Sequence, residues 1–124
     1  MKKRVLAIAL LFAGSVWAEW SSIGENDVDT VYVDLQSMHS QGNIRKVLEL
    51  QDLKQRGKNG EMSVLTKSEY DCAKATYRVM AVTTYAGPMA AGKKISSKTI
   101  NSKVWISVES AADDETVFDT VCAQ

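Results

Sequence analysis

Residues 62–85, MSVLTKSEYDCAKATYRVMAVTTY, decide the fold of this chain. Threonine, tyrosine and valine dominate the second half, from Thr76 to Tyr85, and these residue types favour β-strands. Only alanine-rich dips interrupt the stretch, so it predicts either two strands or one bent strand. Gly87, Pro88 and Gly92 end it, because proline cannot donate a hydrogen bond within a central sheet and glycine marks a turn.

Two further strands are predicted before this stretch. From Thr30 to Leu35 the residues alternate, which places Val31 and Val33 on one face. Gly42 lies in a turn sequence, Gln41-Gly42-Asn43, where the chain can reverse. Residues 44–53 alternate as a strand would, although a helical face can also be drawn through them. We predict a strand there, forming a hairpin with the one before it.

Towards the carboxyl end, the spacing of apolar residues changes from the alternation of a strand to the spacing of a helix. A last strand is predicted around Val104 to Val108, and Ser110-Ala111-Ala112-Asp113 resembles a capping box at the start of a helix. Acidic residues in a first helical turn suit the helix dipole, so we interpret these as capping charges and not as a paired-carboxylate site: Asp113, Asp114 and Glu115. The apolar residues that follow at helical spacing share one face: Val117, Phe118, Val121 and Cys122. The predicted fold is therefore mainly β within the α+β class, a small antiparallel sheet or sandwich with one carboxyl-terminal helix.

Residues 1–18 are typical of a secretory signal peptide. Lys2-Lys3-Arg4 precede an apolar stretch over residues 5–13, and small side chains allow a cut between Ala18 and Glu19. The apolar stretch is shorter than the roughly 18 to 20 residues that cross a bilayer. No cysteine follows the cut that could accept a lipid, so we expect no membrane anchor. We expect an exported protein, in the periplasm first and at the surface or secreted second, with one domain over residues 19–124.

Composition and cysteines narrow the class further. Removing Lys2, Lys3 and Arg4 from the 15 basic residues leaves 12 against 15 acidic ones, a net charge near −3. This balance gives no support for nucleic-acid binding, which usually needs a basic excess. The cysteines are Cys72 and Cys122, and an exported chain with an even count most simply pairs them. The predicted disulfide ties the terminal helix to the start of the strand region over residues 70–85.

Residues able to perform chemistry are few. His39 is the one histidine, and the neighbouring Ser37 and Ser40 are too common to indicate a catalytic site. One histidine and two distant cysteines do not make a zinc site, and Asp27 with Asp29 lacks the other ligands of a calcium loop. We therefore predict no catalytic, metal or cofactor-binding residues. Several aromatic residues could line a recognition groove, although a small domain needs most of them in its core: Trp20, Tyr77, Tyr85 and Trp105.

Several short motifs resemble the surface-adhesin protein E family of small exported bacterial proteins. They are Glu69-Tyr70-Asp71-Cys72-Ala73, Tyr77-Arg78, Tyr85-Ala86-Gly87 with the turn at Gly92, Trp105 before an acidic helix start, and Val117-Phe118-Asp119-Thr120-Val121-Cys122. The resemblance implies an antiparallel β fold with a helix linked through Cys72 and Cys122. It also implies binding to extracellular-matrix proteins of a host, as for the member that gives the family its name. That member resembles a surface lipoprotein, and this chain has no lipid-accepting cysteine near Glu19, so we favour a periplasmic protein.

The leading hypothesis from the sequence is an exported, non-catalytic β-rich module that binds a protein or another cell-envelope component. A second hypothesis is a secreted or surface adhesin for host matrix proteins. A third, a small hydrolytic enzyme, depends only on His39 and scattered carboxylates.

Overall fold

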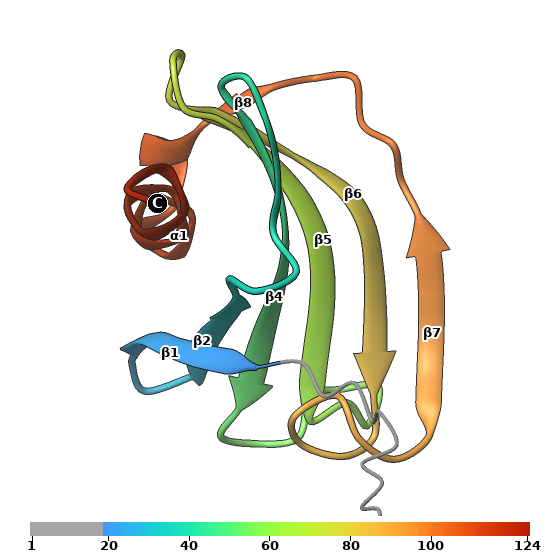
Figure 1. Ribbon diagram of the computed structural model, residues 1–124. Helices are drawn as coiled ribbons and strands as arrows, with labels where there is room; N and C mark the ends of the chain where they lie inside the picture. Colours follow the sequence, from blue (N-terminus) through green and yellow to red (C-terminus); the bar gives the residue numbers. More distant parts are fainter. Residues whose placement is uncertain (1–18) are drawn as a thin grey trace, which may run out of the picture.

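The computed structural model describes residues 19–124, and in them one antiparallel sheet carries one helix (Figure 1). The strands are β1 (Trp20–Glu25), β2 (Asp29–Asp34), β3 (His39–Gln41), β4 (Ile44–Leu53), β5 (Ser63–Asp71), β6 (Thr76–Tyr85), β7 (Lys94–Thr99) and β8 (Ile106–Ser107). A 3-10 turn, η1 (Val108–Ser110), leads into the helix α1 (Ala112–Cys122). The predicted fold class is confirmed.

The order of strands across the sheet is β1-β2-β4-β5-β6-β7. The two short strands pair outside this path, β3 with β4 and β8 with β6. Residues 62–85 form two strands rather than one bent strand, because the chain turns between Asp71 and Thr76 with Ala75 at a φ of 52°. This hairpin lies in the middle of the sheet, which is why it dominates the fold.

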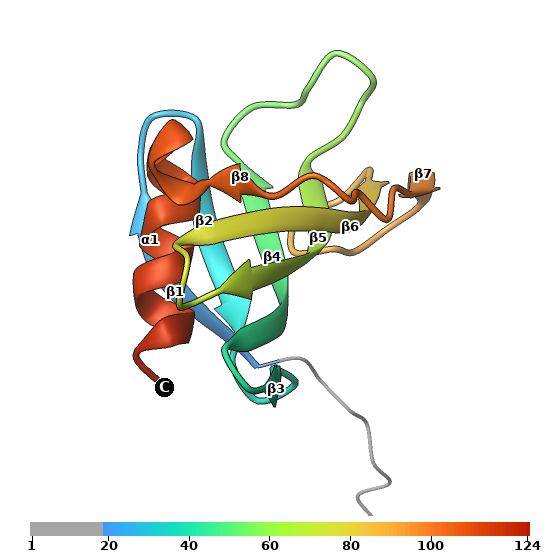
Figure 2. The same cartoon turned by 90° about the horizontal axis from the view of Figure 1, so that it is seen from above.

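The sheet is curved, and α1 lies against its concave side, next to β1 and β2 (Figures 1 and 2). Alternation in β2 turns Val31 and Val33 inward, as the sequence predicts, and helical spacing in α1 turns Val117 and Val121 toward them. Val33, Val117 and Val121 are completely buried. The cluster that they form is completed by Val47, Tyr70 and Val108. This core pins the helix to one end of the sheet.

The two strands β5 and β6 do not pair evenly along their length. The register shifts between Lys67 and Ser68, which pair with Ala81 and Val79 and leave Met80 unpaired in the ladder. The shift changes which residues of β6 face the helix side, from Val79 before it to Val82 after it. The carbonyl of Met80 instead accepts hydrogen bonds from the amides of Ile100 and Asn101, at 2.8 and 3.1 Å.

Near the carboxyl end one prediction is confirmed only in part and another is wrong. The strand expected around Val104 to Val108 is shorter, Ile106–Ser107, because its ladder with β6 is limited to these two residues. Val104, which precedes the ladder, is 66% exposed. The expected capping box is absent, since Ala111 occupies the N-cap position and makes no side-chain hydrogen bond there. The serine that does cap is Ser107, whose hydroxyl accepts from the amide of Glu109 at the start of η1.

Three strands lie outside the sequence predictions: β1, β3 and β7. β3 runs into the predicted turn at Gly42 and pairs with β4. β1 has a register irregularity between Ser22 and Gly24, and only part of it packs inward. β7, with the sequence KISSKT, has all six residues exposed. The predicted signal peptide lies outside the described residues. Within residues 19–124, no helix has the length and apolar character that a membrane span requires.

Candidate functional site

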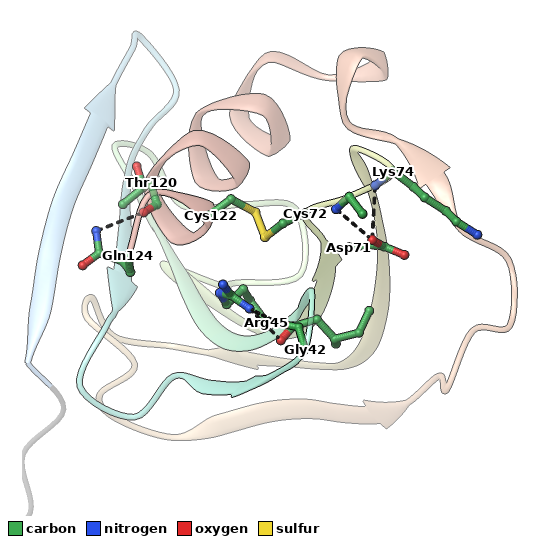
Figure 3. Close-up of a disulfide and its surroundings, with 10 residues drawn as sticks. Gly42, Arg45, Asp71, Cys72, Lys74, Thr120, Cys122 and Gln124 are labelled. Atoms are coloured by element: carbon green, nitrogen blue, oxygen red, sulfur yellow. Dashed lines mark hydrogen bonds between the residues drawn. A yellow bond between two sulfur atoms is a disulfide. The ribbon is translucent and has the colours of Figure 1, made fainter.

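A disulfide joins Cys72 to Cys122, with 5.6 Å between their Cα atoms (Figure 3). Cys72 lies in the turn after β5, and the Asp71 carboxylate holds that turn by accepting from the amides of Ala73 and Lys74 at 3.0 and 3.2 Å. The amide of Cys72 donates to the carbonyl of Asn43 in the β3–β4 turn at 2.8 Å. The bridge therefore fastens the last turn of α1 to the point where two hairpin turns meet. It fixes the helix over one end of the sheet.

A groove of about 400 Å³ opens on the concave face beside the first turn of α1. Its lining comes from four strands and the helix start: Val31, Glu49, Gln51, Val64, Thr66, Ser68, Tyr77, Val79, Val82, Ala111, Asp113 and Asp114. The strand register explains this set, because Glu49 pairs with Thr66 and Thr66 pairs with Val82, so all three side chains share one face. The volume lies within the range of small ligand sites.

Glu49 is the acidic group on the floor of the groove. The hydroxyl of Tyr70 donates to Glu49 Oε2 at 2.5 Å, and the ring of Tyr70 stacks on that of Tyr77 with 5.7 Å between centroids. Burial raises the pKa of Glu49 to about 7, and the nearby charges of Asp114 and Asp113 act in the same direction, against the hydrogen bond from Tyr70. Glu49 therefore titrates near neutral pH.

Asp113 and Asp114 form the helix side of the groove. Burial raises the pKa of Asp113, and the charges of Asp29 and Asp114 raise it further. Burial also raises the pKa of Asp114, partly offset by the hydroxyl of Tyr77. Behind this wall Asp29 is almost fully buried, and its Oδ2 accepts from the side chain of Gln51 at 2.9 Å. Negative charge therefore gathers around the groove.

Basic side chains do not balance these acids in the part of the chain that the structure describes. Its ion pairs are Lys46–Glu69, Lys54–Glu25 and Arg78–Glu69. Arg78 lies on the opposite face of the sheet from Tyr77, with its guanidinium 4.4 Å from the centre of the Trp105 ring. Lys98 pairs with Val82 at the outer edge of the concave face, but it makes no ion pair with a groove carboxylate in residues 19–124.

Of the sequence-predicted candidates, Ser37 and His39 line one small pocket, together with Lys46 and Lys67. His39 is exposed at the start of β3, and the hydroxyl of Ser37 donates to the carbonyl of Asp34 rather than to the imidazole. Of the aromatic candidates, Tyr77 lines the groove and Trp105 packs under Arg78. Within residues 19–124, no three of the histidine, cysteine and acidic residues are grouped as metal ligands.

Sequence reasoning missed Glu49 for an identifiable reason. In residues 44–53 the even-numbered positions, which include Leu48 and Leu50, are more apolar than the odd-numbered ones. The sequence alone therefore suggests that the even-numbered side chains face the core. The structure turns the other set, with Val47 and Glu49, toward the helix. The signal available was an acidic residue within an otherwise strand-like run, which becomes informative only when its neighbours across the sheet are known.

The family model described as surface-adhesin protein E matches residues 20–123. The structure is similar to that of crystal form II of Haemophilus influenzae protein E, with a TM-score of 0.68 and 16% sequence identity, over 94% of this chain and 97% of that one. No curated protein is similar enough in sequence to count as a match. At this identity the structural likeness shows a shared fold.

Proposed function

Because the chain belongs to the surface-adhesin protein E family, we propose that it is an exported, non-catalytic binding module for a protein or another component of the cell envelope. The observation that carries this proposal is the family match over residues 20–123. The groove beside α1 adds support, because it offers an open, partly apolar surface on a scaffold that a disulfide holds rigid. A rigid scaffold loses little conformational entropy when it binds.

The proposal includes cleavage of a signal peptide between Ala18 and Glu19 and a periplasmic location for the single domain over residues 19–124. The mass of the protein isolated from producing cells tests the cut, since the mature chain would begin at Glu19. Fractionation into cytoplasm, periplasm and membranes tests the location. Recovery of the uncut chain with reduced cysteines from the cytoplasm would contradict both.

Affinity capture tests the binding role. The oxidised protein is immobilised and exposed to solubilised envelope extract, and the control beads carry the same protein reduced and alkylated at Cys72 and Cys122. We expect components enriched on the oxidised protein alone, which then bind the purified protein directly. Equal recovery on both kinds of bead would argue against a folded binding surface.

Adhesion to host extracellular-matrix proteins is the second candidate, and the description of the family as a surface adhesin supports an adhesive role. It requires the domain to be displayed outside the cell. Protease treatment of intact cells separates the two candidates, because a periplasmic protein is degraded only after the outer membrane has been opened, whereas a displayed adhesin is degraded at once.

A further inference from the structure

The groove beside α1 has a partly apolar floor that includes Glu49, and an acidic wall on the side of the helix. Val64, Val79 and Val82 supply apolar surface from β5 and β6, and Glu49, Asp113 and Asp114 supply the carboxyl groups. An apolar surface next to acids suits a side chain that is aliphatic along its length and positively charged at its end. Lysine and arginine have this form, because their methylene groups pack on apolar surface while their charged ends stay with polar partners.

The charges of the groove have no counterpart within residues 19–124. None of the three ion pairs of this part of the chain includes Glu49, Asp113 or Asp114. Asp29, buried behind Gln51, adds a further carboxyl to the same side of the domain. Burial is the main cause of the raised pKa of all three groove acids, and repulsion from neighbouring carboxylates adds to it for Glu49 and Asp113. A bound cation would relieve the repulsion and would gain charge-assisted hydrogen bonds.

The N-terminus of α1 would favour an anionic ligand, so its effect must be compared with that of the carboxylates. A helix N-terminus corresponds to about half a positive charge and attracts anions. Here Asp113 and Asp114 lie in the first turn itself, and Glu49 faces it from β4. The carboxylates of the first turn outweigh the half charge of the helix dipole, so the electrostatic balance favours a cation.

We propose that this groove binds a lysine or arginine side chain, flanked by apolar residues, from a segment of a protein partner, a proposal that rests on the binding role proposed above. The ligand class is then a basic, partly apolar protein segment. The apolar floor would hold the flanking residues and the side-chain methylenes, and Asp113 and Asp114 would accept hydrogen bonds from the charged end.

A nuclear magnetic resonance titration of the oxidised, isotope-labelled protein tests this. The probes are three end-capped peptides, Gly-Leu-Lys-Val-Gly and its counterparts with norleucine or glutamate in place of lysine. We expect the lysine peptide to shift the amide signals of Thr66, Ser68 and Val79 saturably. The double variant Asp113→Asn, Asp114→Asn should weaken this binding about tenfold, which corresponds to the loss of about 1.4 kcal/mol.

The matched control is the double variant Glu115→Gln, Asp119→Asn, which removes two charges from exposed positions of the same helix and should leave binding within about twofold. A third variant, Glu49→Gln, keeps an acceptor for the Tyr70 hydroxyl and should also weaken binding. Equal binding of the norleucine peptide, tighter binding of the glutamate peptide, or an unchanged affinity in the Asp113/Asp114 variant would each overturn the proposal.

The two proposals can fail separately. If an envelope partner is captured and binds the Asp113/Asp114 variant as tightly as the wild-type protein, the groove assignment fails while the binding role stands. If the lysine peptide binds as expected but no partner is enriched from envelope extracts or matrix proteins, the groove assignment stands and the binding role fails.

Discussion

The two ends of the sheet differ in how they are covered. At the covered end, α1 packs on β1, β4 and β5, and the side chains of Val33, Val117 and Val121 are completely buried. At the open end, formed by β6 and β7, every residue of β7 is exposed and no residue of β6 is fully buried. Stability is therefore concentrated where the disulfide fastens the helix, and the remaining surface is free to contact other molecules.

Of the changes considered, removing the disulfide should have the largest effect on stability, and it should act on the covered end of the sheet. The bridge closes a loop of 50 positions, for which chain entropy predicts about 4 kcal/mol of stabilisation. The double variant Cys72→Ser, Cys122→Ser should lose about this much in denaturant unfolding. Amide hydrogen exchange should accelerate first in α1 and β1. Unchanged unfolding midpoints would show that the core holds the helix without the bridge.

The titration of Glu49 should give the next largest effect. Because burial raises its pKa from 4.5 to about 7, the native state binds the proton more tightly than the unfolded chain does. Stability of the wild-type protein therefore falls as the pH rises between these values. At pH 8 the variant Glu49→Gln should be more stable than the wild-type protein by up to about 3 kcal/mol, and at pH 4 about equal to it. Parallel stability curves across this pH range would contradict the assignment.

A pair of valine substitutions compares packing at the two kinds of site. Val117→Ala removes apolar volume from a completely buried position and should lower the free energy of unfolding by about 2 kcal/mol. Val104→Ala, at a position 66% exposed, should change it by less than about 0.5 kcal/mol. Urea unfolding of both variants measures the difference, and similar losses would mean that residues 100–105 are more tightly packed than the structure shows.

The smallest effect is a gain. Ala111 is the N-cap of α1, with extended backbone at φ −149° and ψ 135°, and it provides no side-chain acceptor. Ala111→Ser should stabilise the domain by about 1 kcal/mol by capping a free amide of the first turn. Thermal unfolding beside the variant Ala123→Ser, at the other end of the helix, measures the gain. Equal midpoints would show that the first turn has no amide left to cap.

The sequence predicts the covered end of the sheet better than the open end. Regular alternation and helical spacing predict β2, β4 and the apolar face of α1, because burial imposes those periods. β7 could not be predicted in this way, because all six of its residues are exposed in the described part of the chain and therefore show no burial pattern. The groove could not be predicted, because it depends on how the strands pair and where the helix lies. Glu49 and Asp114 are far apart in the chain, and they come close only when β4 and the start of α1 lie on the same face of the sheet.

One feature of the core also bears on the order of events during folding. Its valines come from β2, near the start of the described chain, and from α1, at the end, with Val31 and Val121 in one cluster. Contacts between segments so distant in sequence form late, because a long loop must close first. During synthesis, the inner face of β2 therefore stays exposed until α1 has been made. During that interval its valines can aggregate or bind a chaperone.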